Sequence, residues 1–318
     1  MRQDLSLHGG SSASPAQHRI ATNSIELDYL EQGEGAPLLM LHGFPDHAAS
    51  WRPLAERLGS GIRQLAPDQR GYRGSSRPGA VQDYRIETLV RDLLGMIDAL
   101  ELEQVHLCGH DWGGVIAFEF AERFPERIAG LIVLNAPPAR IFQHMILHHA
   151  QQRAASQYIT LLRSEAADSV FCEAQADALI ERFLGDAIRR KLLTSRDIES
   201  YRDAWTQPEA WSAMRAWYRA APFVIPPADA ITALEPDIGL PVLAIACPVL
   251  IIWGERDTVF VPSMPDMIAS ACPHARVIRL PEAGHVPHRD APALCAELIR
   301  DFIFADSAAS FDKDQYHG

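Results

Sequence analysis

The chain has 318 residues, of which 47% are hydrophobic and 22% charged, a composition typical of a globular protein with a large core. Its formal net charge of −12 disfavours nucleic acid and anionic membrane surfaces as partners, because both would repel an acidic protein. The sequence contains no run of about eighteen apolar residues, so we expect no membrane span.

The first 19 residues are polar and rich in serine and glycine, which predicts a disordered leader at residues 1–19. After it, short apolar runs alternate with segments of helical periodicity. Such runs, without polar alternation, are typical of strands that are buried on both faces of a parallel sheet. The predicted strands are residues 38–41, 105–108, 131–134, 249–253 and 275–280, and the predicted helices include residues 86–100, 115–123 and 293–304.

Residues 137–240 interrupt this alternation with helical periods, many aromatic residues and a proline-rich end. We interpret them as a helical cap, or lid, inserted into an α/β core formed by residues 20–136 and 241–305. Alternating strands and helices predict a mostly parallel, doubly wound sheet in that core. Residues 306–318 are polar and are expected to form a frayed tail.

The five cysteines are odd in number, widely spread and mostly embedded in apolar runs. This pattern is typical of reduced, buried thiols, and it favours a cytoplasmic location. The sequence has no paired cysteines at the close spacing of a zinc or redox site.

The sequence GHDWGG at residues 109–114 lies between a predicted strand and a predicted helix. Small residues two positions before and after Asp111 permit a tight strand-to-helix turn that lifts the central side chain clear of the sheet. The turn also places Asp111 at a helix N-terminus, where free N–H groups favour negative charge. Since aspartate is equally a preferred helix cap, the turn alone leaves a structural and a catalytic interpretation open.

A carboxylate nucleophile would restrict the chemistry. Its attack on an ester or amide would yield an anhydride, whereas displacement at a saturated carbon yields an alkyl-enzyme ester. A histidine must then activate water to hydrolyse that ester. Asp257 and His285 follow the last two predicted strands, so Asp111, Asp257 and His285 occur in the order nucleophile, acid and base.

The sequence HGFP at residues 42–45 follows the first predicted strand. There, the backbone N–H groups of Phe44 and Trp112 would form an oxyanion hole for the hydrolytic step. Four segments in register favour the catalytic interpretation over a set of unrelated structural residues.

Together these motifs resemble those of the soluble epoxide hydrolases of the α/β-hydrolase superfamily. The resemblance covers about residues 20–305 and includes HGFP at 42–45, DQRGY at 68–72, GHDWGG at 109–114, Asp257 and His285. It implies an α/β-hydrolase fold, a cis peptide before Pro45, and Asp111 as the residue that forms the ester. Haloalkane and haloacetate dehalogenases share part of this set.

In epoxide hydrolases, two lid tyrosines hold and protonate the epoxide oxygen. The resemblance assigns these roles to Tyr218 and Tyr158, with Tyr201 as the alternative for the first tyrosine. An epoxide leaves as an alkoxide, which is far more basic than a halide and therefore needs a proton donor. Phe44 and Trp112 are expected to contact the substrate as well.

Three functions stay open at this stage: an epoxide hydrolase, a haloalkane or haloacid dehalogenase with the same aspartate, and a non-catalytic ligand-binding protein of the same fold. Trp112 stands where haloacetate dehalogenases typically have an arginine, which disfavours a haloacid substrate. The expected partners are water and a small apolar epoxide or haloalkane, and a homodimer is left open. Arg73 stands where epoxide hydrolases usually have a glycine, and we expect Gly74 to take up that turn.

The sequence predicts neither a metal ion nor a cofactor. His144 and His148 have helical i, i+4 spacing, but no glutamate accompanies them in a catalytic register, so we interpret them as exposed helix residues. No glycine-rich nucleotide-binding loop is present in the sequence.

Overall fold

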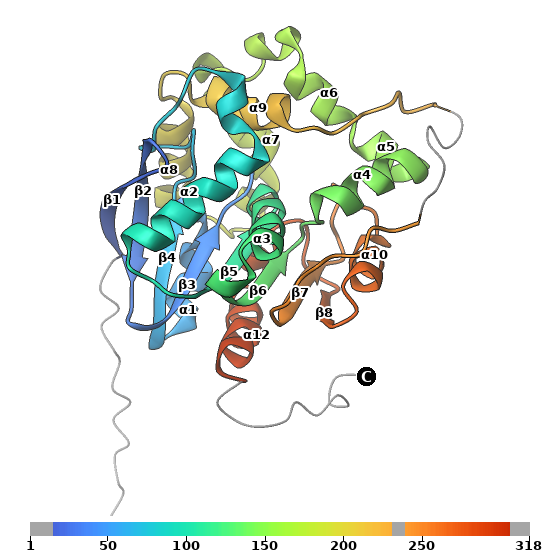
Figure 1. Cartoon of the computed structure of the whole chain (residues 1–318). Coiled ribbons are helices and arrows are strands. Elements are labelled where there is room, and N and C mark those ends of the chain that lie inside the picture. The colour runs from blue at the N-terminus through green and yellow to red at the C-terminus, as the bar shows by residue number, and fades with distance from the viewer. Residues whose placement is uncertain (1–14, 231–238, 306–318) are drawn as a thin grey trace, which may run out of the picture.

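The computed structural model describes residues 15–230 and 239–305. Eight strands form one sheet in the order β1-β2-β4-β3-β5-β6-β7-β8 (Figure 1). Strand β2 is antiparallel to both of its neighbours, and all other neighbouring strands are parallel, so the mostly parallel sheet is confirmed. The strands are β1 (Ala16–Thr22), β2 (Ile25–Gln32), β3 (Gly35–Leu41), β4 (Gly61–Pro67), β5 (Val105–His110), β6 (Ile128–Leu134), β7 (Val249–Gly254) and β8 (Ala275–Leu280).

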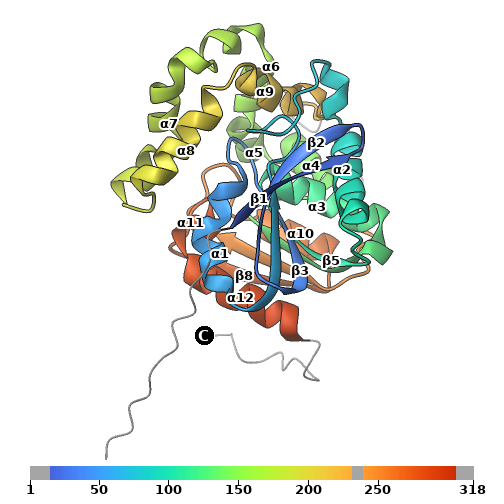
Figure 2. The same cartoon turned by 90° about the vertical axis from the view of Figure 1, so that its left-hand side faces the viewer.

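Alternate side chains of the central strands pack into two cores on opposite faces of the sheet. In β3, Leu39 belongs to one core and Leu38 to the other. The continuous apolar runs in the sequence follow from this burial on both faces. Helices cover the first face with α2 (Ile86–Ala99), α3 (Trp112–Arg123) and α10 (Met264–Ala271), and the second with α1 (Arg52–Leu58) and α12 (Pro292–Phe304) (Figures 1 and 2).

The predicted N-terminal boundary of the core at residue 20 is wrong. Residues 16–19, which we assigned to a disordered leader, belong to edge strand β1, and Ala16 pairs with Glu31 of β2. Most side chains of β1 are exposed, so this strand lacks the apolar run that identifies the central strands. The remaining leader residues 1–14 and the tail 306–318 lie outside the described residues.

Between β6 and β7 the chain forms a series of helices, and we name residues 139–220 the helical segment. It lies over one end of the sheet (Figures 1 and 2). The described part of residues 137–240 contains no strand. The α-helices of this segment are α4 (Ala139–His148), α5 (Ala150–Ala155), α6 (Gln157–Arg163), α7 (Ala176–Arg189), α8 (Ser195–Trp205) and α9 (Ala210–Ala220).

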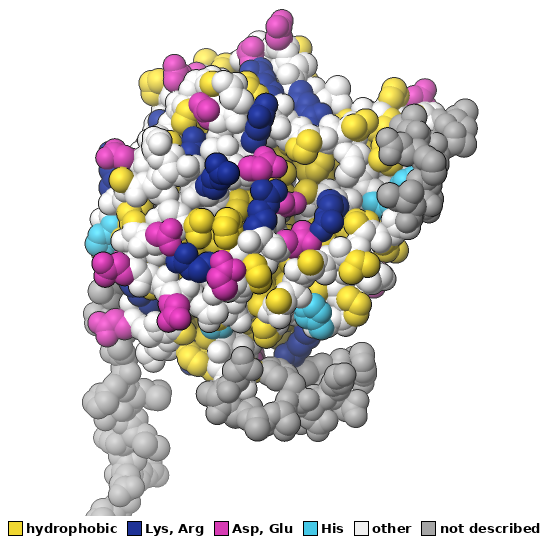
Figure 3. Space-filling view, viewed as in Figure 1, with side chains coloured by type: hydrophobic (Ala, Val, Ile, Leu, Met, Phe, Trp, Pro, Cys, Tyr) yellow, Lys and Arg dark blue, Asp and Glu magenta, His cyan; other side chains and the backbone are white. Residues whose placement is uncertain are grey.

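Three features bear on the surroundings of the protein. Basic and acidic side chains are interspersed on the face shown in Figure 3, so charge of one sign is not gathered into a single patch there. Within residues 15–230 and 239–305, no helix has the length and apolar character needed to cross a bilayer. The five cysteines, all of which the structure describes, are free thiols, and four of them are buried.

A buried ion pair holds the loop after β4. The Nε and Nη2 atoms of Arg70 each donate to a carboxylate oxygen of Asp92 on α2 at 2.7 Å, and both side chains are only 4% exposed. The indole Nε1 of Trp217 on α9 donates to the carbonyl oxygen of Arg70 at 3.0 Å. The motif at residues 68–72 therefore links α2, this loop and the helical segment.

The turn beside this motif differs from our expectation. Arg73 itself has a positive φ of 41°, whereas Gly74 does not adopt a positive φ. A Cβ atom at Gly74 would collide with the carboxylate of Asp28, so a larger residue there would have to displace that side chain. The expectation that Gly74 takes up the turn is therefore wrong.

We predict that Asp92→Ala lowers the free energy of unfolding by about 3–5 kcal/mol, because it leaves the buried guanidinium of Arg70 without a counter-charge. Urea denaturation followed by circular dichroism would measure this loss. Glu87→Ala is the control, since Glu87 pairs with Arg123 at 3.5 Å on the surface and should contribute less than about 1 kcal/mol. Equal effects of the two substitutions would contradict the structural role assigned to the Arg70–Asp92 pair.

Candidate active site

Asp111 stands directly between β5 and α3, at the end of the sheet that the helical segment covers. Its backbone has φ 51° and ψ −121°, a conformation that an L-residue adopts only when its surroundings enforce it. A Cβ atom at Gly109 would collide with Gly113, and one at Gly113 would collide with the carbonyl oxygen of Leu41. The glycine spacing thus permits the tight turn that exposes the Asp111 carboxylate to the cavity described below.

The three residues that the sequence motifs group together lie side by side. The Nε2 atom of His285 lies 3.6 Å from Oδ2 of Asp111. On the other side of the ring, Nδ1 of His285 donates to Oδ2 of Asp257 at 2.9 Å. One imidazole therefore stands between two carboxylates, of which Asp257 is almost fully buried and Asp111 faces the cavity.

Sequence reasoning missed the residue that fixes Asp257. Asn135, directly after β6, donates through Nδ2 to Oδ2 of Asp257 at 2.7 Å, and its Oδ1 accepts from the backbone N–H of Gly254 at 2.7 Å. Backbone N–H groups of Val259 and Phe260 donate to the second carboxylate oxygen. The positive φ of 38° at buried Asn135, visible only in the structure, is the sign of its constrained position.

The loop after β3 reaches the same carboxylate. The backbone N–H of Phe44 donates to Oδ1 of Asp111 at 2.8 Å, and the Phe44–Pro45 peptide bond is cis, as the family resemblance implies. Oδ2 of Asp111 is left to face His285. Trp112 begins α3, and its side chain lines the cavity beside Asp111, while its second predicted role as an oxyanion donor stays a prediction.

A narrow cavity lies above Asp111, between the sheet and the helical segment. Tyr158 of α6 and Tyr218 of α9 both line it, and their ring centroids are 6.0 Å apart at an interplanar angle of 79°. The remaining lining side chains are apolar: Val115, Pro137, Phe142, Ile159, Phe223 and Phe260.

Comparison with known proteins agrees with this arrangement. A family model described as alpha/beta hydrolase fold matches residues 36–292. The chain belongs to this family. It is an epoxide hydrolase-like hydrolase.

Relatives and solved structures match this hydrolase over most of its length. An AB hydrolase superfamily protein of Bacillus subtilis, YfhM, is 31% identical over 291 residues, which cover 89% of this chain and 96% of that protein. Epoxide hydrolase 3 of Xenopus tropicalis is 30% identical, over 93% of this chain and 80% of that protein. An epoxide hydrolase of Bacillus megaterium, solved as a mutant with its product, has a TM-score of 0.80 and 28% identity, over 90% of this chain and 99% of that one.

The two carboxylates of the hydrolase change the acidity of the histidine. Burial alone would lower the pKa of His285, but Asp257 and Asp111 outweigh it and raise that pKa to about 10. Burial would likewise raise the pKa values of Asp111 and Asp257, yet the nearby His285 holds both below their usual value. At neutral pH the resting site therefore holds an imidazolium between two carboxylates.

The two cavity tyrosines are protonated at neutral pH. Burial raises the pKa of Tyr158 and that of Tyr218 well above the usual value, and the Asp111 carboxylate raises both further. Tyr201, the alternative for the first tyrosine, lines a different region: its hydroxyl donates to Oδ1 of Asp46 at 2.5 Å. Only Tyr158 and Tyr218 face the Asp111 cavity among the three tyrosines singled out in the sequence.

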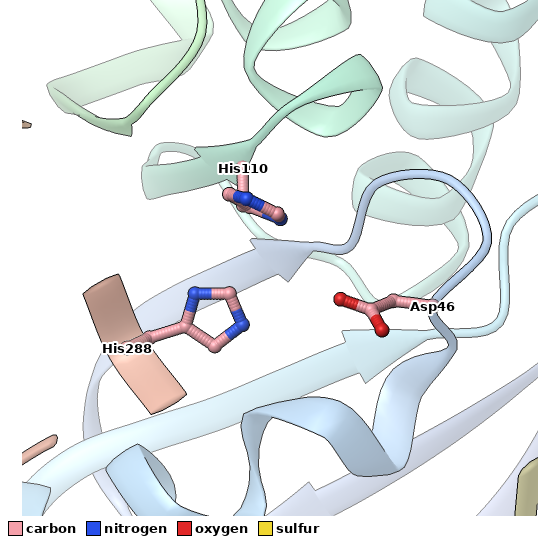
Figure 4. Close-up of side chains that lie close together, drawn as sticks. All are labelled: Asp46, His110 and His288. Carbon is pink, nitrogen blue, oxygen red and sulfur yellow. The ribbon is translucent and has the colours of Figure 1, made fainter. Parts of the chain in front are cut away.

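Asp46, His110 and His288 form a buried group of metal-ligand type beneath the site, with ligand atoms all within 4.8 Å of one another (Figure 4). The Nη2 atom of Arg289 donates to Oδ1 of Asp46 at 2.9 Å. Its positive charge already neutralises the only carboxylate of the group and would repel a cation, which disfavours a metal ion there. The rings of His144 and His148 on α4 are tilted by 37° with centroids 4.5 Å apart, and these residues are not part of this group.

We predict that Asp111→Asn lowers the pKa of His285 from about 10 towards its ordinary value, because one of the two carboxylates that favour the imidazolium is lost. Nitrogen NMR shifts of the labelled imidazole, followed over a pH titration, would measure it. Asp98→Asn serves as the control, since Asp98 is a surface residue that pairs with Arg127. An unchanged pKa of His285 in Asp111→Asn would refute the coupling.

Proposed function

We propose that the protein is an epoxide hydrolase that opens a small apolar epoxide to a vicinal diol through an ester on Asp111. One observation carries the proposal: a carboxylate whose Oδ2 atom lies 3.6 Å from an imidazole shares its cavity with two protonated tyrosines. The relatives support it, because several of them are epoxide hydrolases and the Bacillus megaterium enzyme was solved with a naphthyloxy-propanediol product.

In the first step, Oδ2 of Asp111 attacks an epoxide carbon and the ring C–O bond breaks. Tyr158 and Tyr218 hydrogen-bond to the leaving oxygen, and one of them transfers its proton to it. The N–H of Phe44 holds Oδ1, which leaves Oδ2 as the attacking atom. The products of this step are an alkyl ester on Asp111, a new hydroxyl group and a tyrosinate.

The second step needs His285 as a neutral base. Forming the ester removes the negative charge of Asp111, so the pKa of His285 falls and its proton can return to the tyrosinate. His285, oriented by Asp257, then takes a proton from water while the water oxygen attacks the ester carbonyl carbon. Phe44 N–H, with Trp112 N–H as the proposed second donor, stabilises the oxyanion. The diol leaves, and the imidazolium and both carboxylates are restored.

The cavity indicates the kind of substrate. Asp111 is the only ionisable carboxylate among the lining residues that the structure describes, and none of them is lysine, arginine or histidine. The charge of His285 is already shared between Asp111 and Asp257, and no further cationic side chain lines the described cavity to bind a substrate with its own negative charge. Aromatic and aliphatic walls therefore favour an uncharged epoxide with a small apolar substituent.

We predict that His285→Gln accumulates the ester, because glutamine cannot act as the base of the second step. Intact mass after mixing with styrene oxide should increase by the mass of one substrate molecule, and peptide mapping should locate it on Asp111. Asp111→Ala, treated in the same way, should gain no mass and release no diol.

Other outcomes would point elsewhere. Halide release from chloro- or bromoalkanes, with no diol from any epoxide, would indicate a dehalogenase. The absence of any Asp111 adduct from a broad panel of both substrate types would indicate a ligand-binding protein.

We predict that Tyr218→Phe lowers the rate constant of ester formation by about 10²-fold or more, since a proton donor to the alkoxide is lost. Rapid quenching followed by mass analysis measures that step. Tyr84→Phe is a matched control, because Tyr84 is equally buried and its hydroxyl has no hydrogen-bond partner among the described residues. Retention of full activity in the double variant Tyr158→Phe, Tyr218→Phe would contradict the proposed donors.

A further inference from the structure

Three buried polar side chains meet at one point outside the cavity. The Tyr201 hydroxyl donates to Oδ1 of Asp46 at 2.5 Å, and Nη2 of Arg289 donates to the same oxygen at 2.9 Å. Arg289 Nη2 also lies 2.7 Å from the Tyr201 hydroxyl oxygen. None of the three is more than 5% exposed, so water does not compete for these bonds. We name them the Asp46 joint.

Each member of the joint belongs to a different part of the site. Asp46 lies two residues after Phe44, whose N–H contacts Asp111. Arg289 lies in α11 (Pro287–Asp290), four residues after His285. Tyr201 lies in α8, within the helical segment that carries both cavity tyrosines. The joint therefore connects the loop that contains Phe44, the loop that contains His285 and the helical segment at a single carboxylate.

Neighbouring contacts run between the same three parts. The indole Nε1 of Trp205 on α8 donates to the carbonyl oxygen of Pro45 at 3.0 Å. At the end of α7, Nη1 of Arg190 pairs with Asp290 of α11 at 2.9 Å, and Asp290 accepts from the backbone N–H of Gly284 at 2.7 Å. The helical segment thus contacts both loops on either side of the joint.

His110, which directly precedes Asp111, connects the turn between β5 and α3 to this region. Its Nε2 atom lies 2.8 Å from the carbonyl oxygen of His285, and its ring packs edge-on against that of His288, with centroids 4.8 Å apart. Figure 4 shows both imidazoles beside the carboxylate of Asp46. Asp46 is therefore close to His110, which precedes Asp111, and to His288, which follows His285.

Charge makes the joint sensitive to the loss of one member. Arg289 and Asp46 form a buried ion pair, and both are ionised because the pKa of the aspartate is lowered and that of the arginine raised. Removing either charge would leave the other uncompensated in the interior, which is strongly destabilising. The Tyr201 hydroxyl can be removed alone, because the ion pair survives its loss.

We propose that Tyr201 is a positioning residue, which through Asp46 and Arg289 holds the helical segment in register with the loops of Phe44 and His285. The role rests on the proposed function, since Tyr158 and Tyr218 must reach the oxygen of an epoxide that Asp111 attacks. Tyr201 touches no reacting atom in this scheme. It fixes the distance between the donors and the nucleophile, to which reaction rates are steeply sensitive.

A merely structural tyrosine would behave differently. Its loss would lower the melting temperature, while the folded enzyme kept both rate constants. The loss of a positioning residue on the helical segment slows ester formation more than ester hydrolysis, because ester formation needs the two tyrosines of that segment. Hydrolysis depends on His285, whose loop keeps its ion pair to Asp46 when the hydroxyl is absent.

The test uses Tyr201→Phe in the full chain, which retains the ring contacts with His47 and Trp205. Rapid-quench mass analysis with styrene oxide, well below the melting temperature, gives the two rate constants separately. We expect ester formation to slow by about tenfold and hydrolysis to change by less than about twofold. Tyr84→Phe, the matched buried tyrosine, should leave both rate constants unchanged. Wild-type values for both steps in Tyr201→Phe, or an equal loss in Tyr84→Phe, would overturn the proposal.

A second variant keeps the proposal testable if Tyr201→Phe fails to fold. Arg289→Lys retains the positive charge beside Asp46 but loses the planar guanidinium that reaches both partners. Because Arg289 follows His285 in the sequence, we expect Arg289→Lys to slow ester hydrolysis more than ester formation, the reverse of the effect of Tyr201→Phe. Unchanged rate constants in this variant would count against the joint.

Hydrogen–deuterium exchange tests the Asp46 joint independently of the proposed function, because it needs no substrate. Tyr201→Phe should speed exchange in peptides that cover residues 43–47 and α8, but not in those that cover α12. If wild-type protein forms no ester with any epoxide, the proposed function fails, and the exchange data still decide on the joint. Unchanged exchange at residues 43–47 and α8 would reject it in either case.

Discussion

One imidazolium held between two carboxylates is the interaction on which the rest of this structure depends. Asp257 and Asp111 both raise the pKa of His285 and so favour its positive charge. In the proposed reaction, converting Asp111 into an ester would remove one of these charges and lower the pKa of His285, which is the change that the second proposed step requires.

Much of the surrounding backbone serves to hold these three charges in place. Positive φ values at Asp111 and Asn135 are unfavourable for non-glycine residues and occur at the ends of adjacent strands. Asn135 connects Asp257 to β7, and Phe44 connects Asp111 to β3. The parallel sheet thereby brings residues from distant parts of the sequence to one edge with little freedom to shift.

Burial explains how much could be predicted. Strands β3, β5, β6 and β7 were predictable because burial on both faces leaves continuous apolar runs. Strands β1, β2 and β4 lack such a run and were missed, whereas β8 was predicted although it lies at the edge of the sheet. The proximity of Asp111, Asp257 and His285 was predictable because each of them follows a predicted strand of the sheet. The Asp46 joint was not, because its members lie 155 and 243 positions apart and no periodicity links them. Asn135 likewise looks like an ordinary loop residue until its backbone angles are known.

The placement of the helical segment divides the site between two stretches of chain. The charges of Asp111, Asp257 and His285 come from the sheet, while the hydroxyl groups of Tyr158 and Tyr218 come from the insertion between β6 and β7. In the proposed reaction, the nucleophile and the proton donors to the leaving group thus come from two different parts of the chain. Substitutions confined to the helical segment would therefore change which leaving group the site accepts, while the residues of the proposed covalent step stay the same. Proteins of one fold can acquire different substrates in this way.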